Sequence, residues 1–215
     1  TITVQVTDGS VSANALIDLA GKMEAKPFPA PLPNDPMRPA DTISLAATNG
    51  RIRVRSTASL HALTDDSAAG RILLSVDGLT NINESGTILF SGVADASSDV
   101  GVGGSVKLLA DRVGLFELAN VDVSGALGGG EILVGGNYQG QGIEATASRT
   151  YVGGDVTLVA DVTELGNGGR VIIWSDENTK FYGDISAIGG AQGGDGGFSE
   201  VSSKESLTFR GSVSL

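Results

Sequence analysis

Short stretches of alternating apolar and polar residues recur along the chain, and many of them follow a glycine. Such stretches open after Gly104, Gly130, Gly154, Gly169 and Gly197. Alternation with a period of two is typical of β-strands that bury one face. Nothing between these stretches has the 3.6-residue period of an amphipathic helix. The pattern predicts an all-β fold in which glycine-rich turns separate short strands.

The spacing of these glycines discriminates between two all-β architectures. The intervals from Gly104 onward are 26, 24, 15 and 28 residues. An antiparallel sandwich needs no such repeat, whereas a parallel β-helix stacks coils of about this length. The 15-residue interval indicates two strands within one coil. We therefore expect a right-handed parallel β-helix that occupies residues 1–215 as one domain. It would contain on the order of nine coils, stacked about 4.8 Å apart.

Within each stretch, the second and fourth residues after the glycine should face the interior. Stacked coils would bring these side chains into continuous aliphatic columns, in which each buried side chain contributes about 1.5–3 kcal/mol. Ser199 is a misfit, because it takes an inward position in the last stretch. The predicted inward residues are Ile72, Leu74, Val106, Leu108, Ile132, Val134, Val156, Leu158, Val171 and Ile173.

Proline and glycine are distributed as a coil of short strands requires. All six prolines lie between positions 27 and 39, and proline lacks the N–H that a strand ladder uses. We therefore expect residues 22–40 to form an extruded loop, and strands to resume at Thr42. The 32 glycines would destabilise a helical bundle, because each interior glycine costs about 1 kcal/mol relative to alanine.

Composition limits the chemistry and the partners. The chain has no cysteine, which excludes disulfides, iron–sulfur clusters and thiolate zinc sites. Its net charge of −11 disfavours nucleic acid and anionic membranes, and no run of 18 apolar residues predicts a membrane span. His61 is the only histidine and has no nucleophile-elbow motif beside it. We expect no catalytic residue, no metal and no cofactor, although acidic pairs such as Asp176 and Glu177 keep a polysaccharide-cleaving enzyme open.

Two groups of outward residues are candidates for contacts. Arg51, Arg53 and Arg55 alternate with apolar residues, so their guanidinium groups would share one face and could bind an anionic glycan or a carboxylate-rich partner. The alternative is pairing with acidic residues on adjacent coils. The second candidate is an aromatic contact patch, which residues 186–197 could instead cover. Its members are Ile172, Trp174, Phe198 and Tyr182, with Phe181 close in sequence.

The C-terminal third resembles a known family. The segments 150–158, 166–176, 180–187 and 189–202, among them Gly166-Asn-Gly-Gly-Arg-Val-Ile-Ile-Trp-Ser-Asp, are similar to the passenger repeats of filamentous-haemagglutinin-like exoproteins. Bacteria export these proteins by the two-partner secretion route. The resemblance is close over about 148–213 and looser over 70–147. It implies a right-handed β-helix, export through an outer-membrane partner, and a role in adhesion or surface structure.

The chain departs from the family pattern at three points. Ser199 and Ser203 stand where the pattern has valine and glycine, and the Asn-Pro-Asn signatures of the N-terminal secretion domain are missing. Their absence indicates either a downstream part of a longer chain or a different export route.

Residues and resemblance together predict a secreted or cell-surface bacterial protein with a structural or adhesive role and no enzymatic activity. Two alternatives stay open. One is a self-assembling extracellular fibre subunit, because the ends of a β-helix expose unpaired strand edges. The other is a polysaccharide-binding or polysaccharide-cleaving β-helix. The expected partners are a host or neighbouring-cell surface, a glycan or matrix, an outer-membrane secretion partner, and further copies joined end to end.

Overall fold

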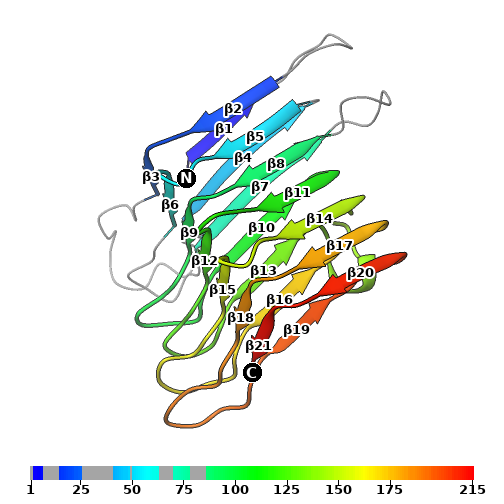
Figure 1. Ribbon diagram of the computed structural model, residues 1–215. Helices are drawn as coiled ribbons and strands as arrows, with labels where there is room; N and C mark the ends of the chain where they lie inside the picture. Colours follow the sequence, from blue (N-terminus) through cyan, green and yellow to red (C-terminus); the bar gives the residue numbers. More distant parts are fainter. Residues whose placement is uncertain (1, 7–14, 26–40, 49, 63–69, 78–85) are drawn as a thin grey trace.

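The chain winds as a parallel β-helix. The computed structural model describes residues 2–6, 15–25, 41–48, 50–62, 70–77 and 86–215. Within them, three parallel sheets of seven strands form, and every coil contributes one strand to each sheet. Figure 1 shows the coils stacked along one axis from the N-terminal end to the C-terminal end. The predicted fold class is therefore confirmed.

We name the sheets A, B and C in the order in which each coil enters them. Sheet A contains β1 (Ile2–Val6), β4 (Thr42–Thr48), β7 (Arg71–Asp77), β10 (Ser105–Leu109), β13 (Glu131–Val134), β16 (Arg170–Ile173) and β19 (Phe198–Val201). Sheet B contains β2 (Ala15–Leu19), β5 (Gly50–Val54), β8 (Thr87–Phe90), β11 (Arg112–Leu115), β14 (Arg149–Val152), β17 (Asn178–Phe181) and β20 (Ser206–Phe209). Sheet C contains β3 (Lys22–Glu24), β6 (Ser59–His61), β9 (Val93–Asp95), β12 (Asn120–Asp122), β15 (Thr157–Val159), β18 (Asp184–Ser186) and β21 (Ser212–Ser214).

The described residues make seven coils rather than about nine, because several turns are longer than the repeat suggests. In sheet A, Val106 pairs with Ile132, 26 residues further on. Ile2 pairs with Ile43, which is 41 residues further on. Seven coils span about 29 Å at about 4.8 Å per coil.

Inward side chains from successive coils stack in register and form the core. Ile72 pairs with Val106 and Val106 with Ile132, and all three are buried. Leu74 likewise pairs with Leu108, and Leu108 pairs with Val134, and these three side chains are also buried. Thr150 and Thr179 bring hydroxyl groups into the sheet B part of this interior, where they hydrogen bond to backbone carbonyls. The predicted inward positions of sheet A, from Ile72 to Ile173, are confirmed.

Val156 and Leu158 also face the interior, but not in the columns of sheet A. Leu158 lies in β15 of sheet C, where it pairs with Val121 and Ile185. Gly154 precedes that strand and Gly169 precedes β16 of sheet A. The 15-residue interval therefore spans two strands of one coil, as predicted.

Glycines at the corner before sheet A let successive coils approach closely. A Cβ atom at Gly130 would lie 2.1 Å from the carbonyl oxygen of Gly104, and one at Gly104 would lie 2.1 Å from that of Gly70. The same carbonyl of Gly104 accepts a 2.9 Å hydrogen bond from the N–H of Glu131. No side chain fits into this ladder, which explains why glycine precedes every sheet A strand from β7 onward.

The predicted boundaries of the proline-rich loop are wrong at their N-terminal side. Residues 22–24 form β3, which pairs in register with β6 through Met23 and Leu60. Ala25 continues the pairing, since its N–H donates to the carbonyl of His61. The alternation in Lys-Met-Glu places Met23 toward the core, and this outweighs the nearness of the prolines. Residues 26–40 lie outside the described residues, and β4 begins at Thr42 as predicted.

Candidate functional site

The outward face of sheet B gathers basic residues from several coils. Strand register brings outward residues into two lines that run across the strands. One line contains Arg51, Thr87, Arg112, Arg149 and Asn178, and the other contains Arg53, Leu89, Gly114, Tyr151 and Lys180. The basic side chains are exposed. We call Arg51, Arg53, Arg112, Arg149 and Lys180 the basic face.

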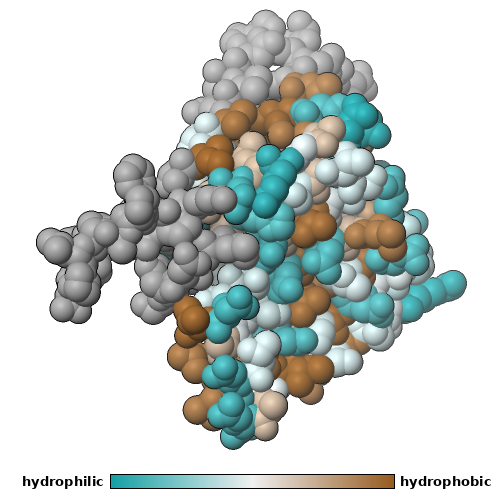
Figure 2. Space-filling view, turned by 90° about the vertical axis from the view of Figure 1, so that its left-hand side faces the viewer, coloured by the Kyte–Doolittle hydropathy of each residue, from teal (hydrophilic) through white to brown (hydrophobic). Residues whose placement is uncertain are grey.

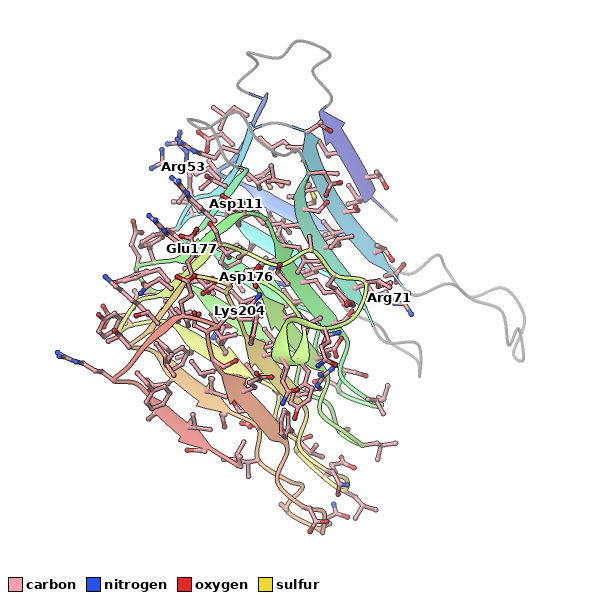
Figure 3. The ribbon with its side chains drawn as sticks, turned by 90° about the vertical axis from the view of Figure 1, so that its right-hand side faces the viewer. Arg53, Arg71, Asp111, Asp176, Glu177 and Lys204 are labelled. Atoms are coloured by element: carbon pink, nitrogen blue, oxygen red, sulfur yellow. The ribbon has the colours of Figure 1, made fainter. Side chains whose placement is uncertain are left out.

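The basic face contrasts with the net charge of −11. Figure 3 shows Arg53 projecting from the same side as a series of other nitrogen-tipped side chains, whereas Arg71 projects from the opposite side. Because focused charge of one sign attracts ligands of the other, this sheet presents an anion-attracting surface on an acidic protein.

Three aromatic rings lie beside these cations. The ring centroids of Phe116 and Tyr151 are 5.2 Å apart with an interplanar angle of 22°, and those of Tyr151 and Tyr182 are 5.8 Å apart. Phe116 is 37% exposed and Tyr151 36%. The position of Phe116 depends on Gly114, where a Cβ atom would lie 2.4 Å from the Cε2 atom of the ring. We call the three rings the aromatic stack.

A groove of about 320 Å³ runs over this part of sheet B. Its floor is Gly114, one wall includes Phe116 and Tyr151, and basic side chains stand at its edges. The groove extends from β8 to β17, across four coils. Its lining residues are Thr87, Leu89, Arg112, Val113, Gly114, Phe116, Arg149, Thr150, Tyr151, Asn178 and Lys180.

The arginines of the groove pair with partly exposed carboxylates, Arg149 through a hydrogen bond and Arg112 through a longer contact. The Nε atom of Arg149 lies 3.1 Å from Glu177 Oε2, and the Nε atom of Arg112 lies 3.8 Å from Asp111 Oδ2. Exposed pairs of this kind contribute about 0–1 kcal/mol. Within the described part of the chain, both ion pairs are made through Nε, and both arginine side chains are more than half exposed.

The three arginines of the predicted stripe divide between two roles. Arg55 forms a bidentate ion pair with Asp18 of the adjacent coil, in which Nε donates to Oδ1 at 2.7 Å and Nη2 donates to Oδ2 at 2.5 Å. This hydrogen bond is the main cause that lowers the pKa of Asp18 below its ordinary value. Arg51 and Arg53 form no ion pair with a described carboxylate, and they extend the basic face instead. Binding of an anionic ligand by the stripe stays a prediction.

The predicted aromatic contact patch is wrong as a single exposed surface. Ile172 and Trp174 point outward from sheet A but are buried, with Trp174 only 8% exposed. Residues 135–147 cover them, not residues 186–197. Phe198 is 46% exposed, and Tyr182 follows the end of β17 and belongs to the aromatic stack.

The 135–147 loop covers sheet A because glycine lets its backbone lie directly on the indole. A Cβ atom at Gly140 would lie 2.6 Å from Trp174 Cε2, and one at Gly136 would lie 2.8 Å from Cδ1. The loop contains the 3₁₀ turn η1 (Tyr138–Gly140), and the ring of Tyr138 meets that of Phe198 edge-on, with 5.7 Å between the ring centroids. The indole Nε1 is buried without a partner among the described residues.

Charged hydrogen bonds fasten this loop to sheet A. Glu144 accepts from Lys107 Nζ at 2.7 Å and from Asn137 Nδ2 at 3.0 Å. The bond from Lys107 is the larger cause that lowers the pKa of Glu144 from 4.5 to about 2. Arg170 donates to Asn137 and to Glu131. The loop is therefore held by ionised side chains at neutral pH.

A second groove, of about 570 Å³, lies at the corner between sheets C and A. Its floor is the backbone of the glycine ladder, and Phe198, Glu131 and Arg170 stand on its rim. Figure 2 faces the side on which these corners project and shows hydrophobic and hydrophilic residues interspersed there. The groove is a consequence of the close coil packing, and its charges are already paired.

His61 does not form a triad with the residues that the structure describes around it. Its Nδ1 atom lies 3.4 Å from Asp95 Oδ2, and Ser97 Oγ donates to the other oxygen of the same carboxylate. The carboxylate thus stands between histidine and serine, whereas a nucleophilic serine must bond to the imidazole. No three potential metal ligands gather among the described residues. No helix of the described chain is long and apolar enough to span a membrane.

Several residues of the basic face and of the aromatic stack were not identified from the sequence. Arg112, Arg149 and Tyr151 are far from the Arg51 stripe in sequence, and only strand register brings them beside it. Their outward positions follow from alternation, but the turn lengths that set the register are irregular. If the turns had a constant length, the sequence spacing alone would have predicted which outward residues of sheet B share a line.

Comparisons with known proteins point to one kind of neighbour. No family model and no curated protein matches the chain. Its structure is similar to the crystal structure of the HMW1 secretion domain from Haemophilus influenzae, with a TM-score of 0.51 and 28% sequence identity. The similarity covers 79% of this chain and 45% of that structure. The chain therefore spans less than half the length of the structure that it matches.

Proposed function

We propose that this chain is a β-helical segment of a bacterial protein that a partner in the outer membrane exports, and that it serves outside the cell as a structural or adhesive element. The observation that carries the proposal is the similarity to a secretion domain over 79% of the chain. The sequence resemblance to exoprotein passengers, over about residues 148–213, supports the same route independently.

The architecture suits a protein that folds outside the cell. Coils stack on one another through nearest-neighbour contacts, so a chain can fold progressively as it emerges. The absence of cysteine leaves no disulfide to form before or during export. Stability comes instead from the aliphatic columns and from the strand ladders.

Export is tested with the protein that the gene encodes, carrying an epitope inserted after Ile143. That side chain is 99% exposed at the tip of the 135–147 loop, so the insertion should leave the coil intact. We expect the epitope in the medium or on intact cells, and its retention inside cells when the outer-membrane transporter is deleted. An unrelated secreted protein should be unaffected by the deletion. Release that does not depend on any such transporter would contradict the proposal.

Self-assembly is a second candidate, favoured by the last coil. Leu207, Phe209 and Val213 occupy the inward column positions of β20 and β21, and they are 46%, 45% and 39% exposed. A second copy could add its first coil there. Sedimentation and negative-stain microscopy of the purified chain should then show concentration-dependent rods. A monomer at all concentrations would refute this candidate.

A further inference from the structure

We infer that the groove of sheet B binds an acidic polysaccharide, with carboxylate-bearing sugar units lying along the line of Arg112 and Arg149. This inference rests on the proposed function, since binding of a polysaccharide would be the means by which the exported β-helix adheres to a surface. Charge, ring contacts and spacing support it.

Arg112 and Arg149 can still bind a further carboxylate. Arg149 and Arg112 contact their own carboxylates through Nε, at 3.1 and 3.8 Å. Both side chains are more than half exposed, so these pairs are weak. A guanidinium binds a carboxylate through two parallel N–H donors. The terminal nitrogens of each arginine offer this fork to a ligand above the sheet.

The ring contacts favour a sugar over a plain polyanion. Tyr151 lies in the groove wall and stacks on Phe116, with 5.2 Å between the two ring centroids. Each of these two rings is about one-third exposed, and the stack fixes its position, so its exposed part is presented to a ligand in a defined place. Aromatic rings bury the apolar face of a flat or chair-shaped ring while their own polar ends stay wet. A peptide made only of acidic residues has no such ring to place there.

The spacing matches a polymer that runs across the strands. Arg112 and Arg149 are direct register partners on adjacent coils, about 4.8 Å apart, which is close to the length of one sugar unit in a polysaccharide. The groove crosses four coils from Thr87 to Lys180, or about 14 Å. A chain of three sugar units would fill it, with Arg51 and Arg53 available beyond its end.

Binding is measured by calorimetry or by retention on an immobilised polymer, at low and at physiological salt. Polygalacturonate is the acidic probe, a neutral galactan lacks the carboxylates, and poly-L-glutamate has carboxylates without sugar rings. We expect binding to polygalacturonate that weakens with salt, and at least tenfold weaker binding to either comparator. Equal binding of poly-L-glutamate would overturn the inference in favour of an acidic peptide or simple charge attraction.

Variants locate the binding on the molecule. The double variant R112Q/R149Q should weaken polygalacturonate binding at least tenfold, whereas R71Q/K204Q removes the same charge elsewhere and should change it less than twofold. Tyr151→Ala should weaken it several-fold, and Tyr151→Phe should retain it. Circular dichroism checks that each variant is folded. Equal losses of binding in the two double variants, or full binding by Tyr151→Ala, would contradict the assignment of the binding site to this groove.

Failure of the binding site and failure of the export proposal give different results. An exported protein that does not bind polygalacturonate contradicts only the site. A chain that binds the polymer through Arg112 and Arg149, but reaches the medium without a transporter, contradicts only the export route.

Discussion

The glycine ladder gives the sharpest prediction for stability. In Gly130→Ala, the new Cβ atom would lie 2.1 Å from the carbonyl oxygen of Gly104, although carbon–oxygen contacts normally begin at about 3.3 Å. The obstacle is backbone, so no side chain can rotate away. Two adjacent coils must separate by roughly 1 Å at this corner, because ordinary contact distance has to be restored.

That separation acts on hydrogen bonds that cross between coils. The carbonyl of Gly104 accepts from Glu131 at 2.9 Å, and the carbonyl of Gly130 accepts from Arg170 at 2.8 Å. Each buried backbone group left unpaired costs about 1–3 kcal/mol. We expect Gly130→Ala to lower the free energy of unfolding by about 3 kcal/mol, a large effect for a single methyl group.

Gly154→Ala is the matched control. There the new Cβ atom would have only the carbonyl oxygen of Tyr182 at 4.0 Å, and the backbone is not in the left-handed region. Alanine at a compatible glycine position stabilises by about 0.4–1 kcal/mol, because it restricts the unfolded chain. The two variants should therefore shift stability in opposite directions.

Urea unfolding, followed by far-UV circular dichroism and by the emission of the buried Trp174, measures both variants. A midpoint for Gly130→Ala within experimental error of that for Gly154→Ala would refute the close approach of coils at this corner. So would a Gly130→Ala protein that is more stable than the parent.

Three further predictions concern single side chains. Ser199→Val removes a buried hydroxyl without a partner among the described residues and continues the column of Val171, so it should stabilise by about 1 kcal/mol in urea unfolding; destabilisation would show that no room exists. Thr150→Val deletes the 2.7 Å bond to the carbonyl of Trp174 and should destabilise by about 1–2 kcal/mol; an unchanged midpoint would contradict this. Because the pKa of Glu144 is about 2 instead of 4.5, its ionised form stabilises the 135–147 loop above pH 4.5, and this stabilisation is lost as the pH falls toward 2. Trp174 emission should shift over that range, and Glu144→Gln should abolish the pH dependence but not the fold; an identical acid transition in the variant would be the contrary result.

The sequence was sufficient for the coil but not for its turns. Alternation after Gly104 and Gly130 identified strands that pair in register, because both the pleat and the glycine corner repeat in every coil. The turn between β13 and β14 follows no such period, since it is set by packing on Trp174. For that reason the alternation predicted that Trp174 is exposed, whereas the 135–147 loop covers it.

The same irregularity limited prediction of the site. The alternation of Arg51 and Arg53 correctly placed both side chains on the outer face. It could not show that Arg112 lies in the same line as Arg51, because the coils between these strands differ in length: Thr87 follows Arg51 by 36 residues, and Arg112 follows Thr87 by 25. Nor could the alternation show that Arg55, unlike Arg51 and Arg53, is paired with a carboxylate, because its partner Asp18 lies 37 residues away on the previous coil.

Both the coil and the groove of sheet B require β11 and β14 to lie side by side in parallel register. The chain has no cysteine, so the pair R112C/R149C can be tested without background. Register partners about 4.8 Å apart fall within the Cα separation of about 4.4–6.8 Å that a disulfide needs. In R112C/Y151C the two positions are roughly 8 Å apart, from the coil spacing and the strand rise. The account predicts rapid disulfide formation in the first variant and little in the second; no bond in the first, or equal rates in both, would contradict it.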